Sequence, residues 1–314
     1  MRVFLGIDGG QSSTMALIAR EDGRVIGAGR SGPCNHISTD EAAAKFSRVV
    51  ADCVDQACRS ASLDPADVSF TSVCCGMSGG PGDKETLIRN LLRTEYLSVV
   101  TDGEIALTGA LSGKPGIIVI AGTGSICYGR NAAGKLVRAG GWGYIFGDEG
   151  SAFDIVRQAL RAALRFEEGW GPATELHATL LEACREGTAN AVLHQFYSEV
   201  WPRSRVAQLA GLVDSAAERG DAVARAILEQ AGQSLSTLAA CVREQLFESE
   251  DDVRISFAGG VFRSRFVRQR FQSLIELSGL ECVAPDHNPA GGALLEAFQL
   301  AGLKVTLSGI PEMK

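Results

Sequence analysis

The sequence of 314 residues has little that would suit a membrane or a nucleic acid. It has no apolar stretch long enough to span a bilayer. It has no signal peptide either, because the short apolar run after Arg2 already ends at Asp8. No basic cluster stands out and the formal net charge is -7, so nucleic acids and anionic membranes are poor partners. These absences indicate a soluble cytoplasmic protein.

Cysteine and histidine are not arranged as ligands. The nine cysteines are an odd number and include no Cys-x-x-Cys pair, which is typical of reduced thiols rather than of disulfides or zinc sites. The four histidines show no metal-ligand spacing. The sequence has no Gly-x-x-x-x-Gly-Lys-[Ser/Thr] loop, so a Walker-type NTPase is not supported, and no Ser-His-Asp or Cys-His set is visible.

What the chain does have is an apolar content of 46%, which is ample for a core. Strand-like runs alternate with helix-like segments, and this predicts an α/β architecture of largely parallel layers covered by helices. The length favours two domains. We expect an N-terminal domain over 1–115, a C-terminal domain over 116–288, and a last helix within 289–314 that returns to the N-terminal domain.

Two parts of the chain resemble copies of one unit. In the first, an apolar strand from Arg2 to Ile7 meets the turn Asp8 to Thr14 and is followed by two more strands. The second begins with the strand Ile117 to Ala121 and the turn Gly122 to Ser125, again followed by two strands. Glycine-rich turns of this kind can form anion-binding nests of N–H groups. The match predicts a duplication, with two unrelated hairpin turns as the alternative.

Two acidic residues follow apolar strands. Asp8 ends the first strand, and Asp102 follows Leu97 to Thr101. Ligands of α/β sheets collect at the carboxyl edge, so these acids indicate a reaction at a nucleotide phosphate. One acid would hold Mg²⁺, usually through water, and the other would orient or deprotonate a hydroxyl nucleophile. The plainer alternatives are that Asp8 caps a turn and that Asp102 caps the next helix.

A glycine-rich stretch lies beyond the second turn. Gly140-Gly141-Trp142-Gly143 and Gly147-Asp148-Glu149-Gly150-Ser151 are separated only by Tyr144-Ile145-Phe146. Two such loops with two acids and one tryptophan favour a polar ligand site over a packing device. The alternative for Trp142 is a core aromatic.

The ordered set D-G-G, G-T-G-S, G-G-W-G and G-D-E-G-S resembles the N-acetylglucosamine kinase family. That family lies in the actin/hexokinase/Hsp70-type superfamily, alongside the benzoyl-CoA reductase-type ATPases. The resemblance covers nearly the whole chain and is strongest from Thr101 to Ala152. It implies a duplicated, two-domain, actin-like (ribonuclease H-like) ATPase fold with ATP and Mg²⁺ in the cleft between the domains.

The resemblance also implies roles for the matching positions. Asp102 matches the catalytic base, and Asp8 would hold the metal. ATP would be bound by Asp8, Gly9, Gly10, Gln11, Ser12, Thr14, Gly122, Thr123, Gly124 and Ser125, and in an adenosine loop by Gly259 and Gly260. The sugar would be bound by Asn35, His36, Asp102, Thr123, Gly141, Trp142, Gly143 and Asp148.

The chain departs from the family pattern in ways that leave the sugar open. Gln11 and Ser12 replace a third glycine and a threonine, and Ile37 replaces a frequent aromatic. The expected function is ATP-dependent phosphorylation of an amino sugar, N-acetylglucosamine to its 6-phosphate, with glucosamine as the alternative substrate.

Two other classes of function are weaker alternatives. A reductase-activating ATPase with an iron–sulfur cluster would need cysteines in the loops after the second turn, and Gly140 to Gly150 contains none. A non-catalytic sugar sensor would have lost the base that Asp102 supplies. A homodimer is an open option.

Overall fold

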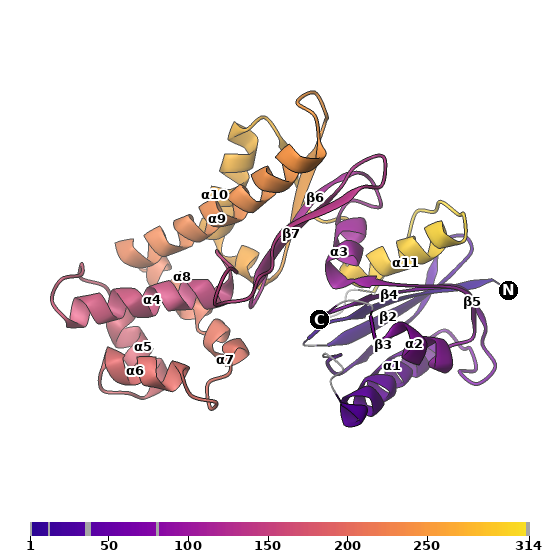
Figure 1. The fold of residues 1–314 in the computed structure, drawn as a ribbon, viewed down its shortest axis with the longest axis horizontal. Helices are drawn as coiled ribbons and strands as arrows, with labels where there is room; N and C mark the ends of the chain where they lie inside the picture. The colour runs from indigo at the N-terminus through magenta and orange to yellow at the C-terminus, as the bar shows by residue number, and fades with distance from the viewer. Residues whose placement is uncertain (1, 12, 35–38, 80–81, 312–314) are drawn as a thin grey trace. The chain divides into compact units, whose positions relative to one another are not determined.

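The computed structural model describes residues 2–11, 13–34, 39–79 and 82–311. The chain forms two compact units (Figure 1). Unit 1 combines residues 1–115 with 284–314, and unit 2 is the continuous stretch Gly116–Val283. Each unit has one five-stranded mixed sheet and its own helices.

The sheet of unit 1 has the order β3-β2-β1-β4-β5. β1 pairs antiparallel with β2, and β2 with β3, whereas β1 pairs parallel with β4, and β4 with β5. The antiparallel part follows from the short connections at the start of the chain, and the parallel part needs helical crossovers. The strands are β1 (Val3–Gly9), β2 (Thr14–Arg20), β3 (Val25–Ser31), β4 (Phe70–Met77) and β5 (Thr94–Thr101).

Helices cover both faces of this sheet (Figure 1). One face packs on α1 (Asp40–Ser60) and α2 (Glu85–Leu91), the other on α3 (Asp102–Ala110) and α11 (Pro289–Leu300). β1 is buried on both sides, with Leu5 facing the first layer and Phe4 stacked on Phe298 of α11 at 4.1 Å between ring centroids. A strand buried on both faces reads as a continuous apolar run, which is what the sequence shows.

The last helix packs very closely on unit 1. A Cβ at Gly292 of α11 would lie 1.8 Å from the carbonyl oxygen of Ile105, and one at Gly6 of β1 would lie 2.3 Å from the Leu294 nitrogen. The segment just before α11 is also bonded to unit 1, because the Asp286 N–H and the His287 N–H donate to the last carbonyls of α3. Unit 1 therefore resumes at Ala284, five residues earlier than the boundary at 289 that we expected.

The sheet of unit 2 repeats the topology of unit 1. Its order is β10-β9-β6-β7-β8, with β6 antiparallel to β7, β7 antiparallel to β8, and parallel pairs β6–β9 and β9–β10. β6 thus has the place that β1 has in unit 1, which confirms the duplication. The strands are β6 (Gly116–Ala121), β7 (Ser125–Arg130), β8 (Leu136–Gly140), β9 (Arg254–Ala258) and β10 (Glu281–Val283).

Most of unit 2 between its third and fourth strands is helical, as expected. α9 packs on β6, β7 and β8, and the shorter helices gather around α4 (Figure 1). Within the described residues, no helix is long and apolar enough to cross a membrane. The helices are α4 (Ala152–Glu167), α5 (Leu176–Cys184), α6 (Ala189–Phe196), α7 (Arg203–Gln208), α8 (Ala210–Glu218), α9 (Ala222–Leu246), α10 (Arg265–Leu277) and the 3₁₀ turn η1 (Gly260–Arg263).

Candidate active site

Asp8 and Asp102 lie at the same edge of the sheet in unit 1. Asp8 is next to the end of β1 and pairs with Gly76 of β4, and Asp102 begins α3 directly after β5. Because β4 lies between β1 and β5, the two strand ends are roughly 10 Å apart. α3 is held close to β4, since a Cβ at Gly76 would come within 2.3 Å of the Ile105 side chain.

Burial raises the pKa of both acids. For Asp8, burial and then the charge of Asp102 raise the pKa from 3.8 to about 7. Burial also raises the pKa of Asp102, although the Gly103 N–H, the Ser78 hydroxyl and the Lys84 ammonium each act in the opposite direction. A carboxyl group that is costly to ionise is a good place for a cation, because the cation removes the electrostatic cost.

Asp102 is not the cap of its helix. The N-cap of α3 is Thr101, whose hydroxyl accepts from the Glu104 N–H at 3.3 Å while the Glu104 carboxylate accepts from the Thr101 N–H at 3.2 Å. This is a capping box. The Asp102 carboxylate accepts from the neighbouring Gly103 N–H at 2.9 Å. Thr101 therefore fills the N-cap position, and the Asp102 carboxylate accepts from the Gly103 N–H of the first turn.

Sequence reasoning missed Lys84. Its side chain is almost fully buried just before α2, with its ammonium 3.6 Å from Asp83 Oδ1. The positive charge of Lys84 opposes the rise in the pKa of Asp102 and of the buried Cys34 thiol. The ammonium is therefore close enough to both groups to act on them. A lysine before an amphipathic helix carries no local signal of burial.

The first glycine turn is closed by its own backbone. The Gly10 N–H donates to the Ser13 carbonyl at 3.0 Å, and the Gly10 carbonyl accepts from the Cys34 N–H at 3.0 Å. Thr14 is fully buried and its hydroxyl donates to the Gly32 carbonyl at 2.8 Å, so this side chain stabilises the turn from inside. Gln11 is exposed. Ser12 lies outside the described residues, as do Asn35 and His36 of the expected sugar site.

The second glycine turn presents unused donors. Gly122 N–H donates to the Gly124 carbonyl at 2.9 Å, but the N–H groups of Thr123 and Gly124 donate to nothing in the part of the chain that the structure describes. The space beside Gly122 is open, with no atom within 4 Å of the position of a Cβ. Two adjacent N–H groups without an acceptor among the described residues are a feature of anion-binding turns.

The Ser125 side chain faces inward and does not point into an anion site at the second turn. Its side chain is buried, its hydroxyl donates to the Glu149 carbonyl at 2.7 Å, and its N–H donates to Asp148 Oδ1 at 3.3 Å. Ser125 therefore joins the second turn to the G-D-E-G-S loop.

Asp148 is a buried carboxylate against the second turn. It is 4% exposed, has a φ of 62°, and pairs with the guanidinium of Arg203 from α7. A non-glycine residue in that left-handed region costs on the order of 1 kcal/mol, so its surroundings must hold it there. A Cβ at Gly124 would lie 2.5 Å from Arg203 Nη2 and 2.8 Å from Asp148 Oδ2, so a larger residue there would displace this ion pair. Sequence reasoning missed Arg203, which is 55 residues away in sequence and has no motif around it.

Trp142 is not a core aromatic. It is 67% exposed, and the guanidinium of Arg138 lies over its ring at 5.3 Å from the centroid. Gly141 and Gly143 on either side have φ of 74° and 81°, which turn the chain sharply and present the indole to solvent. An exposed tryptophan held by a cation suits the apolar face of a sugar.

The glycines after β9 differ in what they require. A Cβ at Gly259 would come within 2.2 Å of the Ala121 carbonyl oxygen, and its φ is 101°, so Gly259 packs the end of β9 on the end of β6. Gly260 has no atom within 4 Å of the position of a Cβ and is exposed. Gly259 therefore has a packing role within unit 2. Gly260 has no such role, because the space beside it is empty of protein atoms.

These features define the class of the protein. The chain has two copies of one mixed sheet, and each copy has a glycine turn after its first strand. The first copy also has acids at its strand ends. This is the arrangement of a duplicated two-domain ATPase of the actin-like type. The chain belongs to the BadF/BadG/BcrA/BcrD ATPase family, whose model matches residues 5–297.

Several relatives are sugar kinases. The chain is 33% identical to an N-acetylmuramic acid/N-acetylglucosamine kinase of Clostridium acetobutylicum over 95% of this chain and 98% of that protein. It is 30% identical to an N-acetyl-D-glucosamine kinase of Dictyostelium discoideum over 82% and 85%. A solved candidate N-acetylglucosamine kinase from Chromobacterium violaceum superposes with a TM-score of 0.77 at 28% identity, over 94% of this chain and 98% of that one.

Proposed function

We propose that this chain is a kinase that transfers the γ-phosphoryl group of ATP to a hydroxyl of an amino sugar, converting N-acetylglucosamine to its 6-phosphate. The observation that carries the proposal is the position of Asp102, an acid directly after a strand, with a raised pKa, in a helix whose N-cap is Thr101. The family and the names of the relatives support the same reaction.

Asp102 is the proposed general base. Its carboxylate would accept the proton of the attacking sugar hydroxyl as that oxygen bonds to the γ-phosphorus and ADP departs. The Gly103 N–H donates to one carboxylate oxygen and so fixes the orientation of the group. A base whose pKa is raised by burial holds the proton more firmly once it has accepted it.

Asp8 is the proposed ligand of a hydrated Mg²⁺. The pKa of about 7 shows that this carboxylate is costly to ionise alone, so a divalent cation fits there. No group of three metal-ligating side chains is present among the described residues, which suits an ion that keeps much of its water. When bound, Mg²⁺ would neutralise phosphate charge.

The phosphates would be bound mainly by backbone donors. The N–H groups of Thr123 and Gly124 would bind phosphate at the second turn. At the first turn the Gly10 N–H already donates to the Ser13 carbonyl, so the remaining groups of the loop from Gly9 to Thr14 would bind phosphate there. Because the Ser125 and Thr14 hydroxyls are engaged inside the protein, we assign them to shaping the turns rather than to contacting phosphate. Gly260 would lie near adenosine.

Trp142 and Asp148 would bind the sugar, with Gly141 and Gly143 shaping the loop. The exposed indole offers an apolar face, and the Asp148 carboxylate, buried and bonded to Ser125 N–H and Arg203, would accept from a sugar hydroxyl with its remaining lone pairs. Asn35 and His36 remain predictions from the sequence.

Two alternative substrates and one alternative function remain beside this assignment. Glucosamine is the runner-up substrate, and N-acetylmuramic acid is a third candidate because a relative's name includes it. A cluster-bearing reductase activator is disfavoured, since Cys127, the cysteine nearest the second turn, is fully buried in β7. We place the enzyme in the cytoplasm, where ATP is found and where the nine free cysteines would stay reduced.

The test is a coupled ADP-release assay with N-acetylglucosamine, glucosamine, N-acetylmuramic acid and glucose, followed by product identification. The highest kcat/KM on N-acetylglucosamine with a 6-phosphate product is the expected result. ADP release that no sugar accelerates would contradict the proposal. Light scattering on the same sample would determine whether the protein is a homodimer.

A further inference from the structure

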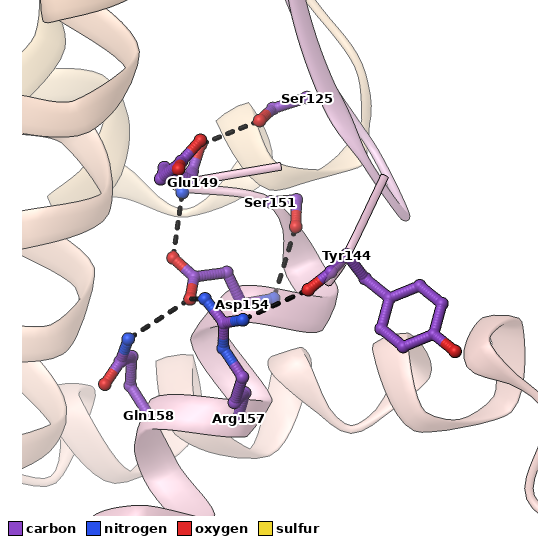
Figure 2. Close-up of polar contacts among 8 residues, drawn as sticks. Ser125, Tyr144, Glu149, Ser151, Asp154, Arg157 and Gln158 are labelled. Atoms are coloured by element: carbon purple, nitrogen blue, oxygen red, sulfur yellow. Dashed lines mark hydrogen bonds and ion pairs between the residues drawn. The ribbon is translucent and has the colours of Figure 1, made fainter. Parts of the chain in front are cut away.

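The two loops of unit 2 that carry Trp142 and Asp148 are both bonded to the first turns of α4. Tyr144 lies two residues after Trp142, and Gly150 lies two residues after Asp148. The Tyr144 carbonyl accepts from Arg157 and the Gly150 N–H donates to Asp154. Figure 2 shows Asp154 and Arg157 facing each other one turn apart on α4.

Arg157 fixes the Trp142 loop. Its Nη1 donates to the Tyr144 carbonyl at 3.1 Å and its Nη2 donates to Asp154 Oδ1 at 2.6 Å (Figure 2). The Tyr144 side chain is 43% exposed, and its ring contacts the Phe153 ring edge-on at 5.0 Å and the Arg203 guanidinium at 5.4 Å. The exposed residues Ile145 and Phe146 come next, so Tyr144 is the anchor of this loop.

Asp154 fixes the Asp148 loop. Its Oδ2 accepts from the Gly150 N–H at 3.0 Å, while its Oδ1 accepts from Arg157 and, at 3.2 Å, from Gln158. The Asp154 side chain is 13% exposed, so these bonds are largely shielded from water. The Asp154 carboxylate thus contacts both loops. Its Oδ2 bonds the Asp148 loop directly, and its Oδ1 bonds Arg157, which in turn bonds the Trp142 loop.

We propose that Asp154 and Arg157 are positioning residues that hold the Trp142 loop and the Asp148 loop in a fixed relation and thereby set the affinity for the sugar. This inference rests on the proposed function, because it takes Trp142 and Asp148 as sugar contacts. Neither residue touches the substrate. Their effect follows from preorganisation: a loop that is already ordered loses less entropy when the sugar binds.

Gln158 provides the matched control. It donates to the same Asp154 oxygen as Arg157, from the next position on α4, but among the described residues it bonds to neither loop. A purely local role of the cluster, such as support of the helix start, would make Gln158 and Arg157 comparable. A link between the loops makes only Arg157 important.

The first experiment is a kinetic cycle on the full chain with N-acetylglucosamine and ATP. Arg157→Met keeps the stem and removes the guanidinium. Asp154→Asn leaves an acceptor for Gly150 and places an amide donor against Arg157. We expect each to raise the KM for the sugar about tenfold, the scale of one charge-assisted hydrogen bond, with the KM for ATP changed less than about twofold.

The double variant should be no worse than either single one, because both break the same link. Gln158→Met should keep the parent KM. Equal effects in Gln158→Met and Arg157→Met, additive effects in the double variant, or a parallel rise in both KM values would overturn the proposal.

The second experiment does not depend on activity. Hydrogen exchange of the amides in 141–150 should become faster in Arg157→Met and stay at the parent rate in Gln158→Met. Unchanged exchange in Arg157→Met would reject the link between the loops whatever the kinetics. If no sugar is phosphorylated by the parent protein, the proposed function fails, and the exchange data still decide whether the loops are held.

Discussion

The raised pKa of Asp8 makes the stability of the protein depend on pH. With a pKa of about 7 in the folded state and 3.8 as the reference, the folded chain binds the proton more tightly between these values. The stabilising contribution is therefore complete below 3.8 and is lost as the pH rises through 7. The lost part is on the order of a few kcal/mol.

We predict that the unfolding free energy of the parent in metal-free buffer falls between pH 5.5 and 8, and that this fall is smaller in Asp8→Asn. Urea titrations at the two pH values measure it. Added Mg²⁺ should recover stability at pH 8 in the parent only, because the neutral amide of the variant cannot supply the charge. Identical pH profiles of parent and variant would show that Asp8 ionises without cost.

A second prediction at the residue scale concerns the base. Asp102→Asn should lower kcat by about two orders of magnitude or more, the usual effect of losing a general base. The fold should be unaffected, since Thr101 caps α3 and the amide oxygen of the variant can still accept from Gly103. Steady-state kinetics beside thermal melting measures both. A variant that turns over like the parent would leave Asp102 with a structural role only.

Some residue roles could be predicted from the sequence and others could not. The apolar runs were enough to place Asp8 and Asp102 at strand ends, where the structure has them. The sequence predicts Thr14 and Ser125 in the two phosphate turns, and it does not show that their hydroxyls bond to the carbonyls of Gly32 and Glu149. Those acceptors come from other segments, so only the folded chain brings them within reach.

At the scale of elements, the two glycines after β9 can be separated by substitution. Gly260→Leu should raise the KM for ATP more than the KM for sugar and leave the melting temperature unchanged, because no protein atom stands where the Cβ would be. Gly259→Ala should instead lower the melting temperature, since its Cβ would clash with the Ala121 carbonyl and φ is 101°. An unchanged KM for ATP in folded Gly260→Leu would place adenosine elsewhere.

The order of elements was readable from the sequence, and their ends were less so. The strand β9 ends at a Gly-Gly step and the helix α11 begins at Pro289, and both signals are visible in the sequence. Gly169, Pro202 and Gly220 do mark breaks in the helical part of unit 2. The break after α5 was not expected, because Arg185 adopts a φ of 56° without a glycine to signal it.

At the scale of the molecule, unit 1 depends on the last helix. α11 buries Leu294 and Phe298 against β1 and β2, and its glycines fit it closely to α3. We predict that a chain ending at Asn288 keeps the protection of amides in 116–283 and loses it in β1 to β5. Hydrogen exchange with mass spectrometry, on the truncated and the full chain in parallel, measures this. Protection of β1 to β5 without α11 would show that the first core is self-sufficient.

The division of unit 1 between the two ends of the chain also fixes an order of events during synthesis. The first 115 residues leave the ribosome early, with the sheet face that carries Phe4 of β1 and Leu17 of β2 still uncovered. Unit 2 is continuous, so it can fold as soon as Val283 has emerged. Translation of the remaining stretch lasts on the order of seconds, and only then can α11 cover that face. We expect that the nascent chain most needs a chaperone during this interval, because the apolar face of unit 1 is then exposed.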